Sequence, residues 1–387
     1  MRKIQIYPNI VGAHTAYNSL IENPPKGYEL IGNKQGLKTG LLNKSRESKV
    51  LRKIYHSFLK VFPTTKIIDS LRKEKEIPDA DLIFSTGHLY NGEKAWILYI
   101  LDSPFSLAGN NYKIFIKNKD KIGKNLEKEN CKKIICAHET SLNFMKKEFS
   151  KRIKDKLILV RPAINLSKIK TKGGKRKKVR ILFMGSVNNP RDFYVKGGLD
   201  VLRTFEKVQE KERDVELIIR CFIPEELRRS IAMNKNIKVI ENLVSKKKLE
   251  ELYSSSDILF LPSHQYILMA VLEAMNFSLP ILGIDTYAVK DYVQNGKNGI
   301  IAKKSEKNKL YESREYPTNT KSEEFMRIIK EYDPNLIERL EKALLKLVKN
   351  KKLRERLGRN GKETIKKKFS IEIQREKLRR VFDESFR

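Results

Sequence analysis

The segment from residue 249 to residue 282 places a carboxylate, Glu273, among apolar residues near a polar loop. A buried carboxylate is costly unless it is hydrogen-bonded or paired, and the two adjacent hydroxyls of a ribose are suitable partners. A structural salt bridge to a lysine is the alternative. In an open parallel sheet, the carboxyl end of a strand beside a helix N-terminus binds anions, because free N–H groups and the helix dipole favour negative charge. The segment therefore predicts a cradle for a nucleoside diphosphate.

The elements that must position this carboxylate can be read from the same segment. Residues 257–261 (DILFL) form an apolar run typical of a parallel strand that is covered on both faces, and Pro262 and Ser263 end it. The apolar residues from Tyr266 to Met275 are nearly continuous, which predicts a largely buried helix. The segment thus predicts the order helix, strand, turn, helix, strand.

The pattern resembles the C-terminal domain of glycosyltransferase family four, whose members are retaining enzymes with the GT-B fold and nucleotide-sugar donors. The family usually carries two glutamates, the first near the donor sugar and the second on the ribose. Glu273 matches the second position, and Gln265 stands at the first. Residues 266–268 replace the glycines that usually follow, which leaves less room for a phosphate. The resemblance implies that the donor-binding residues of this segment are Ser263, Gln265, Tyr266, Ile267 and Glu273.

A second element resembles the same family. The apolar run 179–185 (VRILFMG) predicts a strand that ends in glycine, and after a loop Lys196 and Gly197 open a helix. The corresponding lysine of the family contacts the donor diphosphate, where an ammonium offsets the charge that develops on the leaving group. The family often has an arginine directly after the strand glycine; Ser186 stands there, so Arg191 is the nearest candidate. A solvated surface charge is the alternative for Lys196.

The N-terminal half predicts a second parallel sheet, with strands at 3–7, 81–87, 95–101, 133–137 and 156–161. Gly12 lies in a turn placed like the family's glycine loop that faces the donor phosphates. Asp102 stands where family members often have a histidine, so the resemblance implies that it orients the donor sugar or the acceptor. His88 follows another strand and is a further candidate at the same edge, with ordinary loop structure as the alternative.

Together these features predict an α/β protein of the GT-B fold, with two Rossmann-like, doubly wound domains that face each other across a cleft. We place an acceptor-side domain at 1–167, a basic linker at 168–178 and a nucleotide-sugar-binding domain at 179–368. Residues 303–334 lack periodicity and are interpreted as an insertion or flexible excursion within the second domain. A last helix at 369–387 is expected to cross back to the N-terminal domain.

The chain is strongly basic, with 81 Lys and Arg residues against 47 Asp and Glu residues and a net charge of +34. Such a charge attracts nucleic acid, anionic lipid or phosphorylated substrates. Residues 46–62 read as an amphipathic basic helix, either an ordinary domain helix or one that docks on an anionic membrane. The basic residues are spread throughout and form no recognisable nucleic-acid-binding module, so nucleic acid is not the expected partner. The three cysteines have no metal-ligand spacing, and we expect Cys136 and Cys221 to be buried.

The resemblance implies a retaining glycosyltransferase that moves a sugar from a nucleoside-diphosphate sugar to a glycan or lipid-linked acceptor. It implies no metal and no cofactor beyond the donor. A family member with weakened catalysis that serves as a partner subunit is the first alternative, because of Gln265 and the missing glycines; a basic nucleic-acid-binding protein is the second. No secretory signal or membrane-spanning run is evident, so we expect a cytoplasmic location, with peripheral contact to the inner face of the membrane as the variant.

Overall fold

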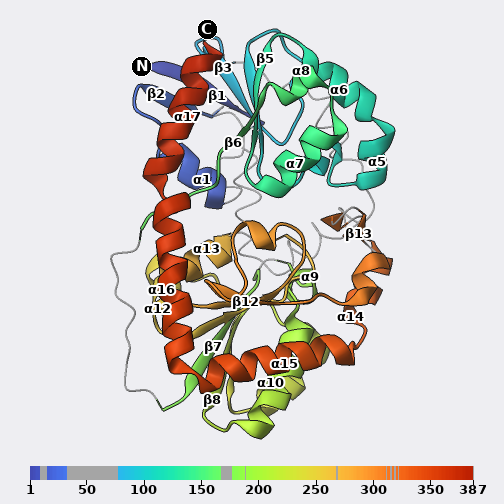
Figure 1. Cartoon of the computed structure of the whole chain (residues 1–387), viewed down its shortest axis with the longest axis vertical. Coiled ribbons are helices and arrows are strands. Elements are labelled where there is room, and N and C mark those ends of the chain that lie inside the picture. The colour runs from blue at the N-terminus through green and yellow to red at the C-terminus, as the bar shows by residue number, and fades with distance from the viewer. Residues whose placement is uncertain are drawn as a thin grey trace. The chain divides into compact units, whose positions relative to one another are not determined.

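The computed structural model describes residues 1–8, 15–32, 77–166, 177–187, 189–266, 269–310, 312–313, 316–317, 320 and 322–386. The chain divides into two compact units (Figure 1). Unit 1 contains Met1–Ala163 and Ile371–Arg387, and unit 2 contains Ile164–Ser370. Several predicted features lie outside the described residues: Gly12, Ile267, most of the predicted basic linker and the amphipathic segment 46–62.

Unit 1 is built on a parallel sheet with the strand order β2-β1-β3-β4-β5-β6. The central strands are buried on both faces, as their continuous apolar runs predict. From β1 the chain moves to β2 on one side and then to β3 on the other, so the order reverses between β1 and β3. The strands are β1 (Arg2–Tyr7), β2 (Tyr28–Ile31), β3 (Leu82–Thr86), β4 (Trp96–Ile100), β5 (Cys131–Cys136) and β6 (Leu157–Leu159).

The helices of unit 1 include the last helix of the chain, α17. Tyr28 donates a hydrogen bond of 2.5 Å from its hydroxyl to Asp383 of α17, and Phe382 packs edge-on against Tyr28 and Phe84. The return of the last helix to the N-terminal unit, which the GT-B prediction required, is therefore observed. The helices are α1 (Thr15–Glu22), η1 (Pro104–Ala108), α5 (Tyr112–Lys117), α6 (Lys119–Glu127), α7 (Glu139–Glu148), α8 (Lys151–Lys154) and α17 (Ile371–Ser385).

Unit 2 contains a second parallel sheet, with the order β12-β11-β10-β7-β8-β9. The chain starts at β7 in the middle, adds β8 and β9 on one side, and returns to add β10, β11 and β12 on the other. This is the doubly wound order that places a ligand site at the reversal, between β7 and β10. The strands are β7 (Val179–Met184), β8 (Val215–Arg220), β9 (Ile237–Ile240), β10 (Ile258–Phe260), β11 (Ile281–Ile284) and β12 (Gly299–Ala302).

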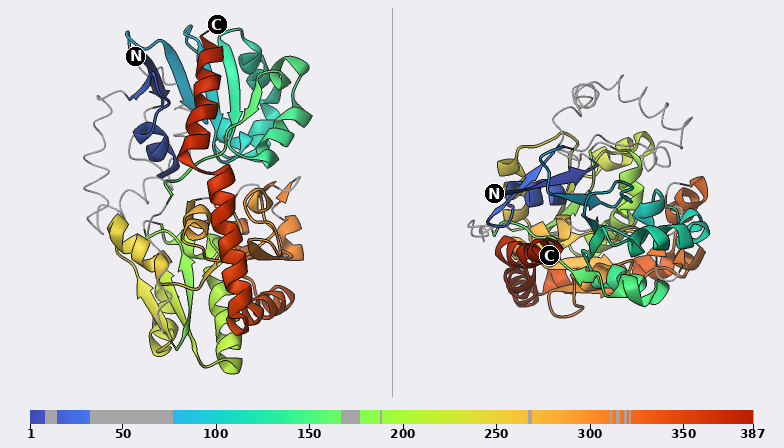
Figure 2. Two further views of the ribbon diagram at one scale, coloured as in Figure 1. Left: turned by 60° about the vertical axis from the view of Figure 1, so that its left-hand side comes forward. Right: turned by 90° about the horizontal axis from the view of Figure 1, so that it is seen from above.

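Helices cover both faces of this sheet, because right-handed crossovers in opposite directions lie on opposite sides (Figure 2). Helix α10 packs against α15, and α13 packs against α16. Helix α16 approaches the turn after α13 very closely, since a Cβ on Gly358 of α16 would lie 1.8 Å from the carbonyl oxygen of Ser278. The helices are α9 (Arg191–Val195), α10 (Gly198–Lys211), η2 (Glu225–Leu227), α11 (Arg228–Met233), α12 (Lys246–Ser254), α13 (Met269–Asn276), η3 (Val289–Asp291), α15 (Pro334–Lys349) and α16 (Lys351–Lys368).

The segment 303–334 contains more regular structure than its sequence indicated. It forms η4 (Glu306–Leu310), a short β13–β14 pair (Glu312–Ser313 with Tyr316–Pro317) and helix α14 (Glu323–Lys330). The apolar face of α14, with Phe325, Met326, Ile328 and Ile329, is buried. The interpretation that this segment lacks periodicity is therefore wrong for α14. Its eight residues are rich in charge, and their apolar pattern is too short to recognise in the sequence. That the segment is an insertion stays a prediction.

All three cysteines are buried, as expected for Cys136 and Cys221, and burial raises the pKa of each thiol to about 12. These thiols are protonated at neutral pH, so they are poor nucleophiles and poor metal ligands. Within the described ranges, no helix combines the length and the apolar character needed to cross a bilayer.

Candidate functional site

The carboxyl ends of β7 and β10 meet at the reversal point of the sheet in unit 2, which we call the switch point. The two strands pair directly, with Ile181 opposite Ile258 and Leu182 opposite Leu259. Gly185 follows β7, and the loop 262–266 follows β10; we call it the donor loop after the donor-binding role that the resemblance implies for it. In parallel sheets this position is an open crevice, because the chain leaves the two strands in opposite directions.

Gly197 allows the start of α10 to lie against the donor loop. Its φ angle is +82°, and a Cβ at this position would lie 2.2 Å from the carbonyl oxygen of Pro262. Only glycine combines this backbone conformation with so close an approach. Lys196, the residue before it, donates a hydrogen bond of 3.1 Å from Nζ to the carbonyl oxygen of Tyr266. The structure therefore brings Lys196, Gly197 and the donor loop together.

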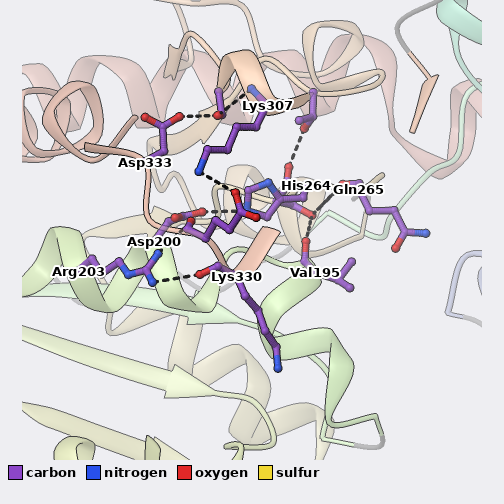
Figure 3. Close-up of polar contacts among 12 residues, drawn as sticks. Val195, Asp200, Arg203, His264, Gln265, Lys307, Lys330 and Asp333 are labelled. Atoms are coloured by element: carbon purple, nitrogen blue, oxygen red, sulfur yellow. Dashed lines mark hydrogen bonds and ion pairs between the residues drawn. The ribbon is translucent and has the colours of Figure 1, made fainter. Parts of the chain in front are cut away.

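The donor loop is held by hydrogen bonds to neighbouring segments (Figure 3). The Ser263 hydroxyl lies 3.2 Å from the Val195 carbonyl oxygen and 2.7 Å from the Gln265 carbonyl oxygen. The Thr286 hydroxyl donates to the Ser263 carbonyl oxygen at 2.7 Å, and the His264 N–H donates to the Val195 carbonyl oxygen at 2.9 Å. Ser263 is buried and its hydroxyl contacts the backbone of the protein, so its contribution is to fix the loop.

His264 and Asp200 form a buried pair that joins the donor loop to the first turn of α10. Nε2 of His264 lies 2.8 Å from Oδ2 of Asp200, and both side chains are almost fully buried. Figure 3 shows the pair at the centre of a polar region that also includes Lys307 and Asp333. The sequence alone identifies no partner for His264. Tertiary structure supplies the partner, and the pair fixes the loop that contacts Lys196.

Glu273 lies on α13, where its carboxylate is mostly buried. Oε2 accepts a hydrogen bond of 2.7 Å from the hydroxyl of Tyr253 on α12. Burial raises the pKa of Glu273, while the Tyr253 hydrogen bond and the positive charge of Arg220 lower it. Among the described residues, Oε1 accepts no hydrogen bond, so one oxygen stays available to an added donor. A lysine salt bridge, the alternative for Glu273, is not formed with any lysine of the described ranges.

Gln265 and Tyr266 occupy the outer part of the donor loop. The side chain of Gln265 points away from the buried hydrogen-bond network in Figure 3. The Tyr266 hydroxyl lies 3.1 Å from the Tyr292 hydroxyl, and its ring lies beside that of Tyr287 at 5.8 Å between centroids. The predicted backbone contacts of Ile267 lie outside the described residues. A tyrosine cluster thus stands where the family pattern has small glycines.

Arg191, the second predicted cation, makes its contacts at the start of α14. Its Nη1 lies 3.2 Å from Oε1 of Glu323, and Nη2 donates to the Ser322 carbonyl oxygen at 3.3 Å. Both ion-pair partners are exposed, with 36% and 89% of the side-chain area accessible. An exposed pair of this kind contributes little to stability and exchanges readily. The structure does not place Arg191 in the group formed by Lys196 and the donor loop.

The two predicted residues of unit 1 lie at the carboxyl ends of its central strands. Nδ1 of His88 lies 2.8 Å from the Thr86 carbonyl oxygen, and the His88 carbonyl accepts from the Ser85 hydroxyl at 2.6 Å. Asp102 follows β4, and its carbonyl oxygen contacts Nε2 of His138. The carboxylate of Asp102 is exposed. Burial is the main cause of the raised pKa of the Tyr17 and Tyr99 hydroxyls, and the negative charge of Asp102 raises both values further.

Two residues near Glu273 were missed by sequence reasoning, Tyr253 and Arg220. Tyr253 belongs to the pattern 249–253, where it reads as a buried apolar position of α12. Arg220 ends the apolar strand β8, and a charged residue at the carboxyl end of a buried strand was a usable signal. In the part of the chain that the structure describes, no group of three or more His, Cys, Asp or Glu residues is arranged to hold a metal ion.

Residues 178–314 match the family model described as glycosyl transferases group 1, and this range lies within unit 2. No curated protein matches the chain in sequence. The matching range contains Lys196, the donor loop, Arg220 and Glu273. The family signal is thus carried by the unit that contains the candidate site.

Solved structures that match nearly the whole chain include the following three. A glycosyltransferase from Rickettsia africae is 11% identical, with a TM-score of 0.60, and covers 100% of this chain and 98% of its own. HepE from Anabaena, in complex with UDP and glucose, is 10% identical, with a TM-score of 0.60 and 99% coverage of both chains. Sucrose-phosphate synthase from Thermosynechococcus elongatus is 11% identical, with a TM-score of 0.61, and covers 100% and 99%.

TarM is 16% identical, with a TM-score of 0.52, over 78% of this chain. This chain spans about half of TarM, 54% of its length. At these identities the likenesses show the fold alone. They confirm the two-domain GT-B fold that the sequence predicted.

Proposed function

We propose that this chain, a group 1 glycosyltransferase by its family match, transfers a sugar from a nucleoside-diphosphate sugar to an acceptor hydroxyl with retention at the anomeric carbon. The observation that carries the proposal is the switch point of unit 2. There Lys196, the glycine-opened start of α10 and the donor loop adjoin one another, and Glu273 keeps one carboxylate oxygen for a ligand. A cation, backbone N–H groups and a carboxylate acceptor match the phosphate and diol of one nucleotide.

Each residue has a role that follows from its chemistry. Glu273 accepts hydrogen bonds from the ribose hydroxyls, and Lys196 binds the diphosphate and offsets the negative charge that develops as it leaves. The N–H groups of Ser263, His264 and Gln265 donate within the protein, so the N–H groups at the start of α10 face the same phosphates. The Gln265 side-chain amide hydrogen-bonds the sugar. Arg191 would have to leave Glu323 before it could reach the diphosphate.

The reaction we propose needs no protein base. The bond from the anomeric carbon to the diphosphate oxygen breaks, and the acceptor oxygen bonds to the same face of that carbon. The acceptor proton passes to an oxygen of the leaving diphosphate, so the configuration is retained. Lys196 and the start of α10 supply the positive charge, and we propose that no metal ion or cofactor is required. Transfer should then be unchanged in a chelator.

Named ligands of the similar structures support the choice of donor. HepE is described in complex with UDP-glucose, and pneumococcal GtfA in complex with UDP and GlcNAc. Staphylococcus aureus TarM is described with UDP and alpha-GlcNAc-glycerol. We therefore propose a UDP-sugar as the first donor to test, with a glycan or lipid-linked acceptor. We place the protein in the cytoplasm, with peripheral contact to an anionic membrane as the variant for a lipid-linked acceptor.

A specific observation favours a second candidate, a weakened family member that acts as a partner subunit. Gln265 replaces the glutamate near the sugar, and Tyr266 contacts Tyr292 where the family pattern has glycines. Such a subunit would bind a nucleotide without transferring its sugar. Nucleic acid is not the proposed partner.

A thermal-shift screen of nucleoside diphosphates and their sugars tests the proposal. We expect one base series to raise the Tm of the wild-type protein and to stabilise Lys196→Ala and Glu273→Ala less. Hydrolysis or transfer of the same nucleotide sugar then separates the enzyme from the partner subunit. Absence of any stabilisation by all the nucleotides would contradict both candidates. Tight, salt-sensitive binding of arbitrary DNA with no nucleotide effect would instead favour a nucleic-acid-binding protein.

A further inference from the structure

Arg220 places a cation beside the switch point of unit 2. It is the last residue of β8, which pairs with β7 so that Arg220 lies opposite Met184. The Gly185 N–H donates to the Arg220 carbonyl oxygen at 2.8 Å. The side chain bends back over the same edge, and its Nη1 donates to the Gly185 carbonyl oxygen at 3.0 Å. The guanidinium therefore lies over the end of β7.

Close packing fixes this position. A Cβ on Gly185 would lie 2.3 Å from Sγ of Cys221, the residue after Arg220. The end of β7 and the turn after β8 are thus in direct contact, and two hydrogen bonds join Gly185 to Arg220. Arg220 is consequently a fixed feature of the strand edge rather than a freely rotating surface side chain.

The guanidinium has bonding capacity that the protein does not use. Arginine has five N–H donors, and Nε of Arg220 is buried without an acceptor. Within the described ranges, the half-buried Arg220 forms no ion pair, whereas the buried Glu216 of the same strand pairs with Arg180. A buried donor without an acceptor is destabilising, and the other N–H groups that the protein leaves unused can donate to the acceptor oxygens of a ligand.

The neighbours of Arg220 indicate which part of a ligand it faces. Its charge acts on Glu273 and on Tyr253, so it lies near the carboxylate assigned to the ribose. Gly185, which it contacts, is at the switch point, towards which the phosphates of a nucleotide extend from the ribose. A guanidinium that lies between Glu273 and Gly185 is therefore positioned to contact the diphosphate. A guanidinium can bind a phosphate through two parallel hydrogen bonds.

Resting on the proposed function, we infer that Arg220 is a second diphosphate-binding cation of the donor site. It reaches the phosphates from the end of β8, while Lys196 reaches them from the start of α10. The family often has an arginine directly after the strand glycine, where this chain has Ser186. Arg220 thereby supplies the guanidinium that is missing at that position. The alternative is a purely positioning role, in which Arg220 does not touch the ligand and its positive charge only keeps the Glu273 carboxylate ionised.

The test compares three ligands with Arg220→Met, Arg220→Lys and the matched control Arg228→Met. The ligands are the nucleoside diphosphate that stabilises the wild type most, its monophosphate and its free nucleoside. Arg228 belongs to the same unit but is bound to Glu241 and Glu225, so its removal should leave all three affinities unchanged. Circular dichroism and the Tm of each variant without ligand establish that it is folded.

We expect Arg220→Met to raise the Kd of the diphosphate by tenfold or more and that of the nucleoside by less than twofold. Arg220→Lys should recover part of the loss, since it restores the charge but not the paired donors. Equal losses for nucleoside and diphosphate would overturn the inference in favour of the positioning role, and no loss for the diphosphate would overturn it outright. If wild-type protein binds none of the nucleotides, the proposed function fails together with the inference. If Arg220→Met does not fold, Arg220→Lys decides by the same criterion: a larger loss of affinity for the diphosphate than for the nucleoside supports the inference, and equal losses overturn it.

Discussion

The carboxyl edges of the two sheets use their polar side chains differently. In unit 2, Glu273 keeps one carboxylate oxygen and Arg220 keeps its buried Nε without a partner in the described ranges. In unit 1, Nδ1 of His88 contacts the Thr86 carbonyl, and the Asp102 carbonyl anchors His138. Both units are parallel sheets with a reversal of strand order, so the fold alone does not separate them. The difference lies in the side-chain bonding capacity that Glu273 and Arg220 keep, which we propose serves a ligand.

The comparison favours the proposal that charges of unit 2 bind the donor, whereas the polar groups described in unit 1 mainly shape its loops. The family match agrees, because it falls on residues 178–314. Acceptor choice would then be a matter of loop shape rather than of a charged cluster. The following predictions can break or sharpen this division.

The largest effect is expected for Lys196→Met in unit 2. Removing the ammonium from the leaving diphosphate should lower kcat/KM by about 10²–10³-fold, the usual result of removing a charge-stabilising donor. Lys235→Met is the matched control, because Lys235 is an exposed lysine of the same unit in the turn before β9. Steady-state transfer assays measure the effect. A loss of less than about threefold for Lys196→Met would remove Lys196 from the chemistry.

Gly197→Ala should destabilise unit 2 far more than Gly296→Ala. Both glycines have positive φ, at +82° and +76°, but only a Cβ at Gly197 would strike the Pro262 carbonyl. We expect about 1–2 kcal/mol for Gly296→Ala from backbone strain, and about 1–3 kcal/mol more for Gly197→Ala from overpacking. Urea unfolding of both variants gives the comparison. Equal losses would mean that the start of α10 does not depend on contact with the donor loop.

Glu273→Gln should weaken nucleotide binding by about tenfold, because a charged acceptor is lost at the ribose. Burial raises the pKa of Glu273 in the folded state, so the folded protein holds this proton more tightly than the unfolded chain. Wild-type stability should therefore fall relative to Glu273→Gln as pH rises from the ordinary carboxyl range through the raised pKa. Nucleotide affinity should rise over the same window, because the ionised form accepts the diol. Calorimetry across that range measures both, and identical pH profiles would contradict the assignment.

The smallest effect on donor binding is expected for Asp102→Asn in unit 1. If Asp102 orients the acceptor or the donor sugar, transfer should fall by about tenfold or less while the Kd of the nucleoside diphosphate stays unchanged. Glu139→Gln, an exposed carboxylate of the same unit that pairs with Arg161, is the control. A matching loss of nucleotide affinity in Asp102→Asn would show that the division between the units is wrong.

Much of the fold followed from local patterns. Continuous, mostly apolar runs predicted β1, β3, β4, β7 and β10 to within a residue or two at each end, because strands buried on both faces consist mainly of apolar residues. Helix α14 was not predicted, since a short helix in a charged segment is specified by packing on its neighbours rather than by a visible period. The sequence predicted that Gly197 opens a helix, but not that this glycine lies against the Pro262 carbonyl.

The candidate site was predictable only where residues adjoin each other in sequence. The element with Lys196 and Gly197 and the segment with Glu273 each carry a recognisable pattern, and the structure joins Lys196 to the donor loop. Arg191 was chosen for its closeness in sequence, yet its contacts are with α14. Closeness to Lys196 in the sequence does not predict closeness in space here. Arg191 begins a five-residue helix, α9, and the direction of this helix decides which way the Arg191 side chain points.

The sequence by itself predicted the fold class, a resemblance to one glycosyltransferase family and the residue types of a nucleotide site, because these depend on local periodicity and on motifs within a few dozen residues. Only the tertiary structure decided the partners: Tyr253 for Glu273, Asp200 for His264, and Gly185 for Arg220. These partners come from strands and helices 20 to 64 residues apart along the chain. Such contacts arise when parallel strands bring their carboxyl ends to one edge, and no local pattern encodes which side chains then meet.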